Sequence, residues 1–247
     1  ATTQLIDDER LTFVQHNFRF LKRFLKLYGV NQVDGILADL GVSSHQFDTA
    51  ERGFSTRFDG PIDGRMDQRG SITGSQILNS YDLQELTQMF RLYGELKNAY
   101  KISQHIVNTR EDKPFDTIQN LKDSLLPLAP KFRENKFYAQ VFQALRIETN
   151  DELGAITRAI PQALELLDIH ARLVVMSFQS LEDRIVKNFF QEATTSGTPQ
   201  GLPVEIAELA AKFALVFNGS QSPSDKEVQE NSRSASVRLR AIERVAA

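Results

Sequence analysis

Two apolar segments, Val33–Leu40 and Leu173–Phe178, have the composition of buried strands, and a long stretch with a purely helical pattern separates them. The middle of Val33–Leu40 is apolar on both faces, as expected of a parallel strand that helices cover on both sides. The first polar residue after this apolar middle is Asp39, near the carboxyl end of the segment and shortly before Ser43-Ser44. The chain is therefore predicted to be an α/β domain that is interrupted by an inserted helical unit.

Further elements support this layout on either side of the interruption. A short strand is predicted at Leu11–Val14, followed by a helix over about Phe18–Tyr28 whose apolar residues recur at helical spacing. After the interruption, a helix is predicted over about Asp151–Leu167. Either Ser180 or Asp183 is expected to cap the helix that follows Leu173–Phe178. Residues Val237–Val245 alternate with a period of two, which predicts a last, antiparallel strand.

The interrupting stretch has two parts. From His45 to about Ser71 the sequence predicts a loop rich in Gly, Asp and Arg, and loops longer than about 12–15 residues are usually functional or disordered. Its aromatic residues Phe47, Phe54 and Phe58 argue against disorder. From about Thr73 to Tyr138 the apolar residues recur at helical spacing throughout.

Composition excludes several classes of site. The chain has no Cys, so it has neither disulfides nor thiolate chemistry, which fits a cytoplasmic protein. Its four His residues lack metal-ligand spacing, and Asp59, Asp63 and Asp67 are better explained as exposed loop acids than as a cation site. No metal site is expected. No apolar run is long enough to cross a bilayer, so no membrane partner is expected. The net charge of −3 means that any nucleic-acid contact must rest on local basic patches.

Asp39 is the first site candidate. In open α/β sheets, ligands bind just beyond the carboxyl ends of the strands, and an acid followed by a small-residue turn suits such a site. The carboxylate could equally cap the next turn of the chain. Spacing alone leaves both interpretations open.

Four segments together resemble one known family. They are DGILADLGVSSHQFDTAERGFSTRFDGPIDGRMD (Asp34–Asp67), YAQVFQALRIETNDEL (Tyr138–Leu153), VVMSFQSLEDRIVKNFF (Val174–Phe190) and, more weakly, SPSDKEVQENSRSASVRLRAIER (Ser222–Arg244). Their order and spacing resemble the bacterial ribosomal RNA small-subunit methyltransferase H family, also called MraW. Several long motifs in series are far more specific than a single short one.

The resemblance implies a Rossmann-like, doubly wound sheet of the S-adenosylmethionine (SAM)-dependent methyltransferase class with an inserted all-helical domain. Residues 1–54 and 147–247 would form the methyltransferase domain, and residues 55–146 the inserted substrate-recognition domain. The implied reaction transfers a methyl group from SAM to the N4 amino group of a decoding-centre cytosine in 16S ribosomal RNA, within the small ribosomal subunit. A DNA or small-molecule substrate is disfavoured by the large helical insertion. A homodimer is left open.

Individual site residues follow from the resemblance. Phe18, Asp39 and Gln46 match family positions that contact SAM, and Asp39, Ser43 and Ser44 are expected to orient the cytosine amine. Without the resemblance, Phe18 would be interpreted as a core aromatic and Gln46 as an ordinary loop amide. The flipped cytosine must be held by stacking and by basic side chains. The candidates for that contact are Arg52, Phe54, Arg57, Arg65, Arg69, Lys97 and Lys101, each of which could instead be a solvated or internally paired group.

The sequence also departs from the family pattern. Gln179 stands where His is expected, Gly64 where Met is expected, His170-Ala171 in place of Gly-Gly, and Ser232 in place of Pro. The family's first strand, its Gly-rich SAM loop and the acid after its second strand would all precede Ala1, so the first strands are expected to be missing and SAM binding to be weak. The alternative function is therefore a catalytically impaired, RNA-binding remnant of the same family.

Overall fold

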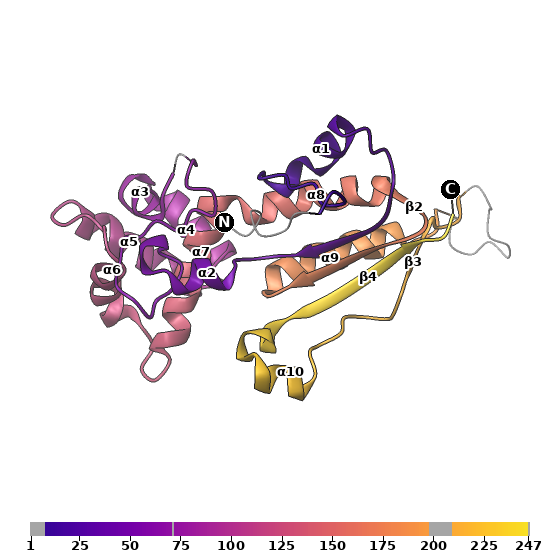
Figure 1. The fold of residues 1–247 in the computed structure, drawn as a ribbon. Helices are drawn as coiled ribbons and strands as arrows, with labels where there is room; N and C mark the ends of the chain where they lie inside the picture. Colours follow the sequence, from indigo (N-terminus) through magenta and orange to yellow (C-terminus); the bar gives the residue numbers. More distant parts are fainter. Residues whose placement is uncertain (1–7, 71, 198–208, 247) are drawn as a thin grey trace. The chain divides into compact units, whose positions relative to one another are not determined.

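The chain folds as two compact units in a computed structural model that describes residues 8–70, 72–197 and 209–246. The first, here called the sheet unit, combines Ala1–Leu40 with Leu153–Ala247, and the second, here called the helical unit, is Gly41–Glu152. The helical unit is thus inserted between two parts of the sheet unit. Figure 1 colours the chain along its sequence and labels most of the helices and strands of both units.

The sheet unit contains a four-stranded sheet in the described residues, with the strand order β1-β2-β4-β3. β1 (Val33–Asp39) is parallel to β2 (Leu167–Ser177), and β4 (Arg238–Arg244) lies antiparallel between β2 and β3 (Phe213–Leu215). Figure 1 shows β1, β2 and β4 running side by side. The predicted strands at both ends of the insertion and the antiparallel last strand are confirmed, although β2 begins earlier than predicted.

One face of the sheet carries the core of the sheet unit. Ile36 of β1 pairs with Leu173 of β2, which pairs with Ile242 of β4, so these three side chains share a face. They pack with apolar residues of three helices: α1 (Leu21–Leu27), α8 (Glu152–Leu166) and α9 (Ser180–Ala193). Two further short helices are η2 (Phe18–Phe20) and α10 (Asp225–Glu230). Since parallel strands linked by helices cover their sheet in this way, the predicted α/β class is confirmed.

The prediction that β1 is buried on both faces is wrong. Leu37, which alternates with Ile36 and Ala38, is 69% exposed, and Asp39 on the same face is exposed as well. Successive side chains of a strand point to opposite faces, and the described helices α1, α8 and α9 pack on the Ile36 and Ala38 face. An apolar sequence therefore did not imply two covered faces.

The predicted strand at Leu11–Val14 is also wrong. The structure assigns no strand to these residues, and Leu11 and Phe13 are both exposed. A strand is stable only when its backbone groups pair with a neighbour. Four apolar or β-branched residues are too few to specify such a partner. The local pattern alone was therefore not enough to predict a strand.

The helical unit is built around a single apolar core; the helices predicted from about Thr73 onwards are confirmed, whereas the segment predicted as a loop from His45 also contains two short helices. Its elements are α2 (Ser44–Asp48), η3 (Ala50–Arg52), α3 (Gly74–Ser80), α4 (Leu83–Leu92), α5 (Ala99–Arg110), α6 (Ile118–Leu125), η4 (Leu126–Leu128) and α7 (Glu134–Asn150). Capping boxes start α3 at Thr73 and α4 at Asp82, where a side chain accepts a hydrogen bond from the backbone three residues on. The amphipathic helices bury Phe90, Phe115 and their neighbours completely.

Candidate functional site

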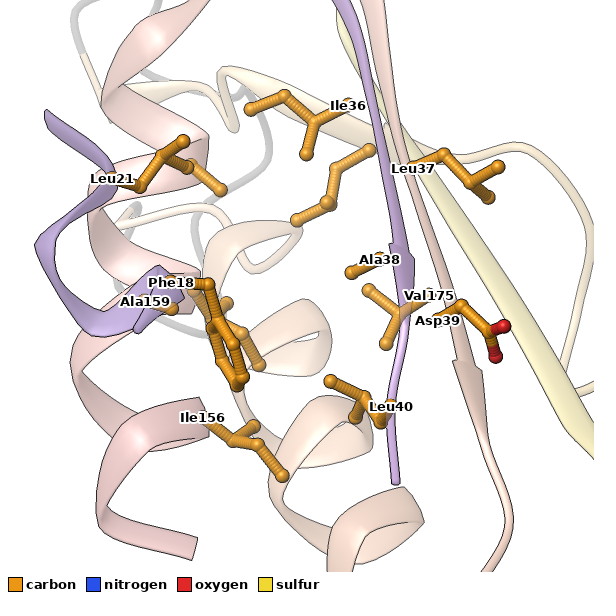
Figure 2. Close-up of a pocket in the computed structure, with 13 residues that line it drawn as sticks. Phe18, Leu21, Ile36, Leu37, Ala38, Asp39, Leu40, Ile156, Ala159 and Val175 are labelled. Atoms are coloured by element: carbon orange, nitrogen blue, oxygen red, sulfur yellow. The ribbon is translucent and has the colours of Figure 1, made fainter. Parts of the chain in front are cut away.

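An apolar cavity of about 270 Å³ lies in the sheet unit, between β1 and the helices α1 and α8. Figure 2 shows the side chains that line it. β1 provides Ile36 and Ala38, with Leu40 just after it, and α8 provides Ile156 and Ala159. Because nearly every lining side chain is hydrocarbon, the cavity suits an apolar or aromatic group and not a charged one.

Phe18 lies in the wall of this cavity, and the residue is 46% exposed. The Asn17 side chain caps the turn that carries Phe18 by accepting a hydrogen bond from the Arg19 backbone. The Gln162 side chain of α8 then fixes that turn: its amide donates to the Arg19 carbonyl at 2.8 Å, and its carbonyl accepts from the Lys22 backbone at 3.1 Å. Phe18 is therefore held as a partly exposed ring on a braced turn, and not as the core aromatic that spacing alone suggested.

Asp39 ends β1, and its backbone borders the same cavity. Its carboxylate, however, leaves the strand on the opposite side. In Figure 2 the side chains of Leu37 and Asp39 point away from the side on which Phe18, Ile156 and Leu40 lie. The apolar cavity and the acid are thus separated by the backbone of β1, and a ligand that touches both must pass the carboxyl end of this strand.

Ser43, Ser44 and Gln46 form the start of α2, in the helical unit. Ser43 is the N-cap: its hydroxyl oxygen accepts from the Gln46 backbone at 3.2 Å, and the Gln46 side-chain oxygen accepts from the Ser43 backbone at 2.9 Å. Ser44 is the first helical residue and is exposed. Ser43 and Gln46 therefore share a local structural role, that of a capping box, in addition to the roles predicted for them.

The arginines predicted to contact RNA fall into two groups. Arg52 donates to the carbonyls of Arg65 and Met66, and Arg65 forms an ion pair with Asp63 at 2.8 Å and donates to two further carbonyls. These two guanidinium groups hold the long loop in shape. Arg57, which lies over the Phe47 ring, and Arg69, which pairs with Asp67, are exposed.

The remaining RNA candidates also differ in exposure. Phe54 is only 7% exposed, and its ring faces the Arg52 guanidinium inside the helical unit. Lys97, just before α5, and Lys101, in its first turn, are both exposed. Side chains that contact RNA must be reachable from solvent, so the lysines meet this requirement and the Phe54 ring does not.

The three loop acids have separate partners. Asp59 accepts from the backbones of Gly60 and Gln119, Asp63 pairs with Arg65, and Asp67 pairs with Arg69. Burial raises the pKa of Asp63, but the hydrogen bonds from Arg65 outweigh it and leave the pKa below its ordinary value. Across the described residues, no group of three or more His, Cys, Asp or Glu is arranged to hold a metal ion. In the same residues, no helix combines the length and apolarity that crossing a membrane requires.

Residues 1–245 match the family described as the MraW methylase family. The chain belongs to that family. It is 46% identical to the ribosomal RNA small subunit methyltransferase H of Amoebophilus asiaticus, over 97% of this chain and 76% of that protein. Proteins of the same name from Parabacteroides distasonis and Christiangramia forsetii are 45% and 42% identical, over 96% and 97% of this chain and 78% of each relative. The family and the methyltransferase fold that the sequence motifs implied are confirmed.

Two of the residues that differ from the expected MraW motifs have an unusual backbone conformation. Gly64 has a φ of 69° and His170 a φ of 68°, so both lie in the left-handed region. Glycine adopts that region freely, whereas His pays a steric cost there. Gly64, at a position where the motif resemblance leads us to expect Met, thus suits the backbone, and His170 does not.

A third difference from the expected motif, Gln179, precedes α9 (Ser180–Ala193), whose sequence predicts Ser180 or Asp183 as the cap. Gln179 is instead the N-cap residue, and Glu182 completes a capping box with it: the Glu182 carboxylate accepts from the backbones of Phe178 and Gln179 at 3.0 and 3.3 Å. Glu182 is only 1% exposed. Asp183 of α9 forms an ion pair with Arg240 of β4, at 2.7 Å, and this contact connects the helix to the sheet.

Proposed function

We propose that this chain is a SAM-dependent methyltransferase that methylates the N4 amino group of a cytosine in 16S ribosomal RNA. The observation that carries the proposal is the family match over residues 1–245, together with relatives at 42–46% identity that are named ribosomal RNA small subunit methyltransferase H. The two-unit fold supports it, because a catalytic sheet and a separate helical insertion can divide cofactor binding from RNA recognition.

The residues present fit SAM, which supplies the methyl group when it is bound. The cavity beside Phe18 is apolar and has a partly exposed aromatic ring in its wall, which suits the adenine part of the cofactor. Asp39 and Gln46 offer polar groups for the rest of the molecule. Phe18, Asp39 and Gln46 are therefore proposed as the cofactor contacts.

Positioning is the main task that remains for the protein. The cytosine amine is a weak nucleophile, because its lone pair is delocalised into the ring, so holding it in line supplies much of the rate enhancement. The exposed Asp39 carboxylate can accept a hydrogen bond from the amine and stabilise the positive charge that develops on it. Ser44 is the better placed of the two serines to help, because the Ser43 oxygen already accepts the Gln46 backbone N–H.

The helical unit is proposed to recognise the RNA in the context of the small subunit. Its exposed cations Arg57, Arg69, Lys97 and Lys101 are the proposed phosphate contacts. Each such contact that is lost should weaken binding and reduce its dependence on salt.

The test is a methylation assay with SAM and assembled small subunits from a strain that lacks the modification. Asp39→Ala should abolish transfer and leave thermal unfolding unchanged, whereas Asp34→Ala, an exposed acid on the same strand, should remain active. Full activity of Asp39→Ala would refute the role of Asp39. Subunit binding by the unmodified chain without any transfer would support the alternative, an RNA-binding remnant.

A further inference from the structure

Phe132 is the most exposed large apolar side chain of the described residues, at 97%. It lies in the turn between η4 and α7, and its φ is 64°. The Arg133 backbone donates to the Pro130 carbonyl at 3.0 Å, which closes a four-residue turn with Phe132 at its third position. A positive φ at that position is the signature of a type II turn, which normally places Gly or Asn there.

Neither packing nor backbone preference explains a Phe at this position. The ring buries almost nothing, and a bulky residue in the left-handed region is destabilised by steric strain. Residues held in such conformations cluster at functional sites, where the surrounding structure holds them in place. Phe132 is held in this way, because the Glu134 carboxylate accepts its backbone N–H at 3.1 Å and Leu128 and Ala129 pack against the core of the helical unit.

The charges around the ring indicate which partner it meets. Lys131, Arg133 and Lys136 are exposed, and Glu134 is the one acid between them. The chain as a whole has a net charge of −3, so this turn is basic against an acidic background. The Asn98 side chain donates to the Leu128 carbonyl, which brings the start of α5 next to η4 and adds Lys97 to the region.

We propose that Phe132 stacks on an unpaired base of the RNA substrate, with Lys131, Arg133 and Lys136 contacting the adjacent phosphates. This inference rests on the proposed function for the identity of the RNA. A ring presented on a fixed turn, with cations beside it, is the combination that binds single-stranded RNA, because every base offers a π-face and every linkage a negative charge.

The test compares four variants at Phe132 and one control variant, all of the full chain, for binding to unmodified small subunits in the absence of SAM. Phe132→Ala, Phe132→Gly and Phe132→Leu should each bind about 10-fold more weakly, the range expected when one base loses its stacking partner. Phe132→Trp, which keeps an aromatic face, should bind as the parent does. Leu92→Ala, which removes an exposed apolar side chain of α4, is the matched control and should leave affinity unchanged.

Two further measurements separate stacking from other roles. Phe132→Gly relieves the strained φ, so its unfolding temperature should equal or exceed that of the parent, which distinguishes lost contact from lost folding. A photo-crosslinking aromatic amino acid at residue 132 should crosslink to ribosomal RNA. Full affinity of Phe132→Leu, or a crosslink to a ribosomal protein only, would overturn the proposal. Because no measurement uses SAM, a chain that binds subunits but fails to methylate them would refute the proposed reaction and leave the stacking intact.

Discussion

Ser43 and Gln46 fix each other at the start of α2, because each accepts a hydrogen bond from the backbone N–H of the other. This arrangement orients the Gln46 side-chain amide. Because its oxygen accepts the Ser43 backbone N–H, its NH₂ group points away from Ser43. If Gln46 contacts SAM, as proposed, it does so as a hydrogen-bond donor whose orientation Ser43 sets.

Ser43→Ala is therefore expected to weaken SAM binding as well as the helix. Loss of an N-cap hydroxyl costs about 1 kcal/mol, and the released Gln46 side chain would lose its fixed orientation. Ser44→Ala removes a hydroxyl one residue later and is the control. Calorimetric titration with SAM checks the expectation, and equal affinities of the two variants would contradict it.

Gly53 is expected to tolerate no side chain. Its φ is 70°, and an added Cβ would lie 2.5 Å from the Pro61 carbonyl oxygen and 2.7 Å from the Asp63 nitrogen. Gly53→Ala should lower the free energy of unfolding by at least about 2 kcal/mol, from backbone strain and the clash together.

Gly64→Ala is the matched control for that variant. Gly64 has nearly the same φ, 69°, in the same unit, but nothing lies within 4 Å of its added Cβ. Gly64→Ala should therefore lower the free energy of unfolding by about 1 kcal/mol, from the strained φ alone. Urea unfolding followed by circular dichroism measures both, and equal losses would show that the clash is relieved by a backbone shift.

His170→Gly is expected to stabilise the sheet unit. The φ of His170 is 68°, and its contact with Glu243, at 3.8 Å between Nδ1 and Oε1, is exposed and weak. Removal of the strain should raise the free energy of unfolding by about 1 kcal/mol. His170→Ala keeps the strain and removes the imidazole, so it should not stabilise; a gain of equal size in both variants would show that strain is not the cause.

Asp63 gives the helical unit an acid-dependent contribution to stability. Its pKa is lowered in the folded chain, so the ionised form is favoured by folding. That contribution is present above the unfolded pKa, about 4, and is lost as the pH falls through the lower folded value. Asp63→Asn should be less stable than the parent at neutral pH, and the difference should shrink below about pH 4. A difference that stays constant down to pH 2 would contradict this origin.

The sequence could predict the elements whose burial follows a period. The stripe of α4 residues at Leu86, Met89 and Phe90 is fully or almost fully buried, and the strand before Asp39 pairs as expected. The family motifs predicted the insertion, because they occur on both sides of a stretch with helical spacing only. The spacing of apolar residues within one element and the order of motifs along the chain can both be read from a single sequence.

What the sequence could not predict depends on partners that are remote along the chain. Whether Leu37 is covered depends on where the helices pack, and whether Arg52 is available for RNA depends on the carbonyls of Arg65 and Met66. The turn at Phe132 was missed for a different reason. A residue in a conformation that its type disfavours leaves no signal in a propensity-based interpretation, because such an interpretation assumes that each residue adopts its preferred state.

The alternation of side chains along β1 has a consequence for how this enzyme can change. A single residue inserted between Val33 and Asp39 would move every later side chain of the strand to the opposite face of the sheet. The Asp39 carboxylate would then point towards the apolar cavity. Individual substitutions can adjust the lining or the acid separately, whereas a change in residue count disturbs both at once.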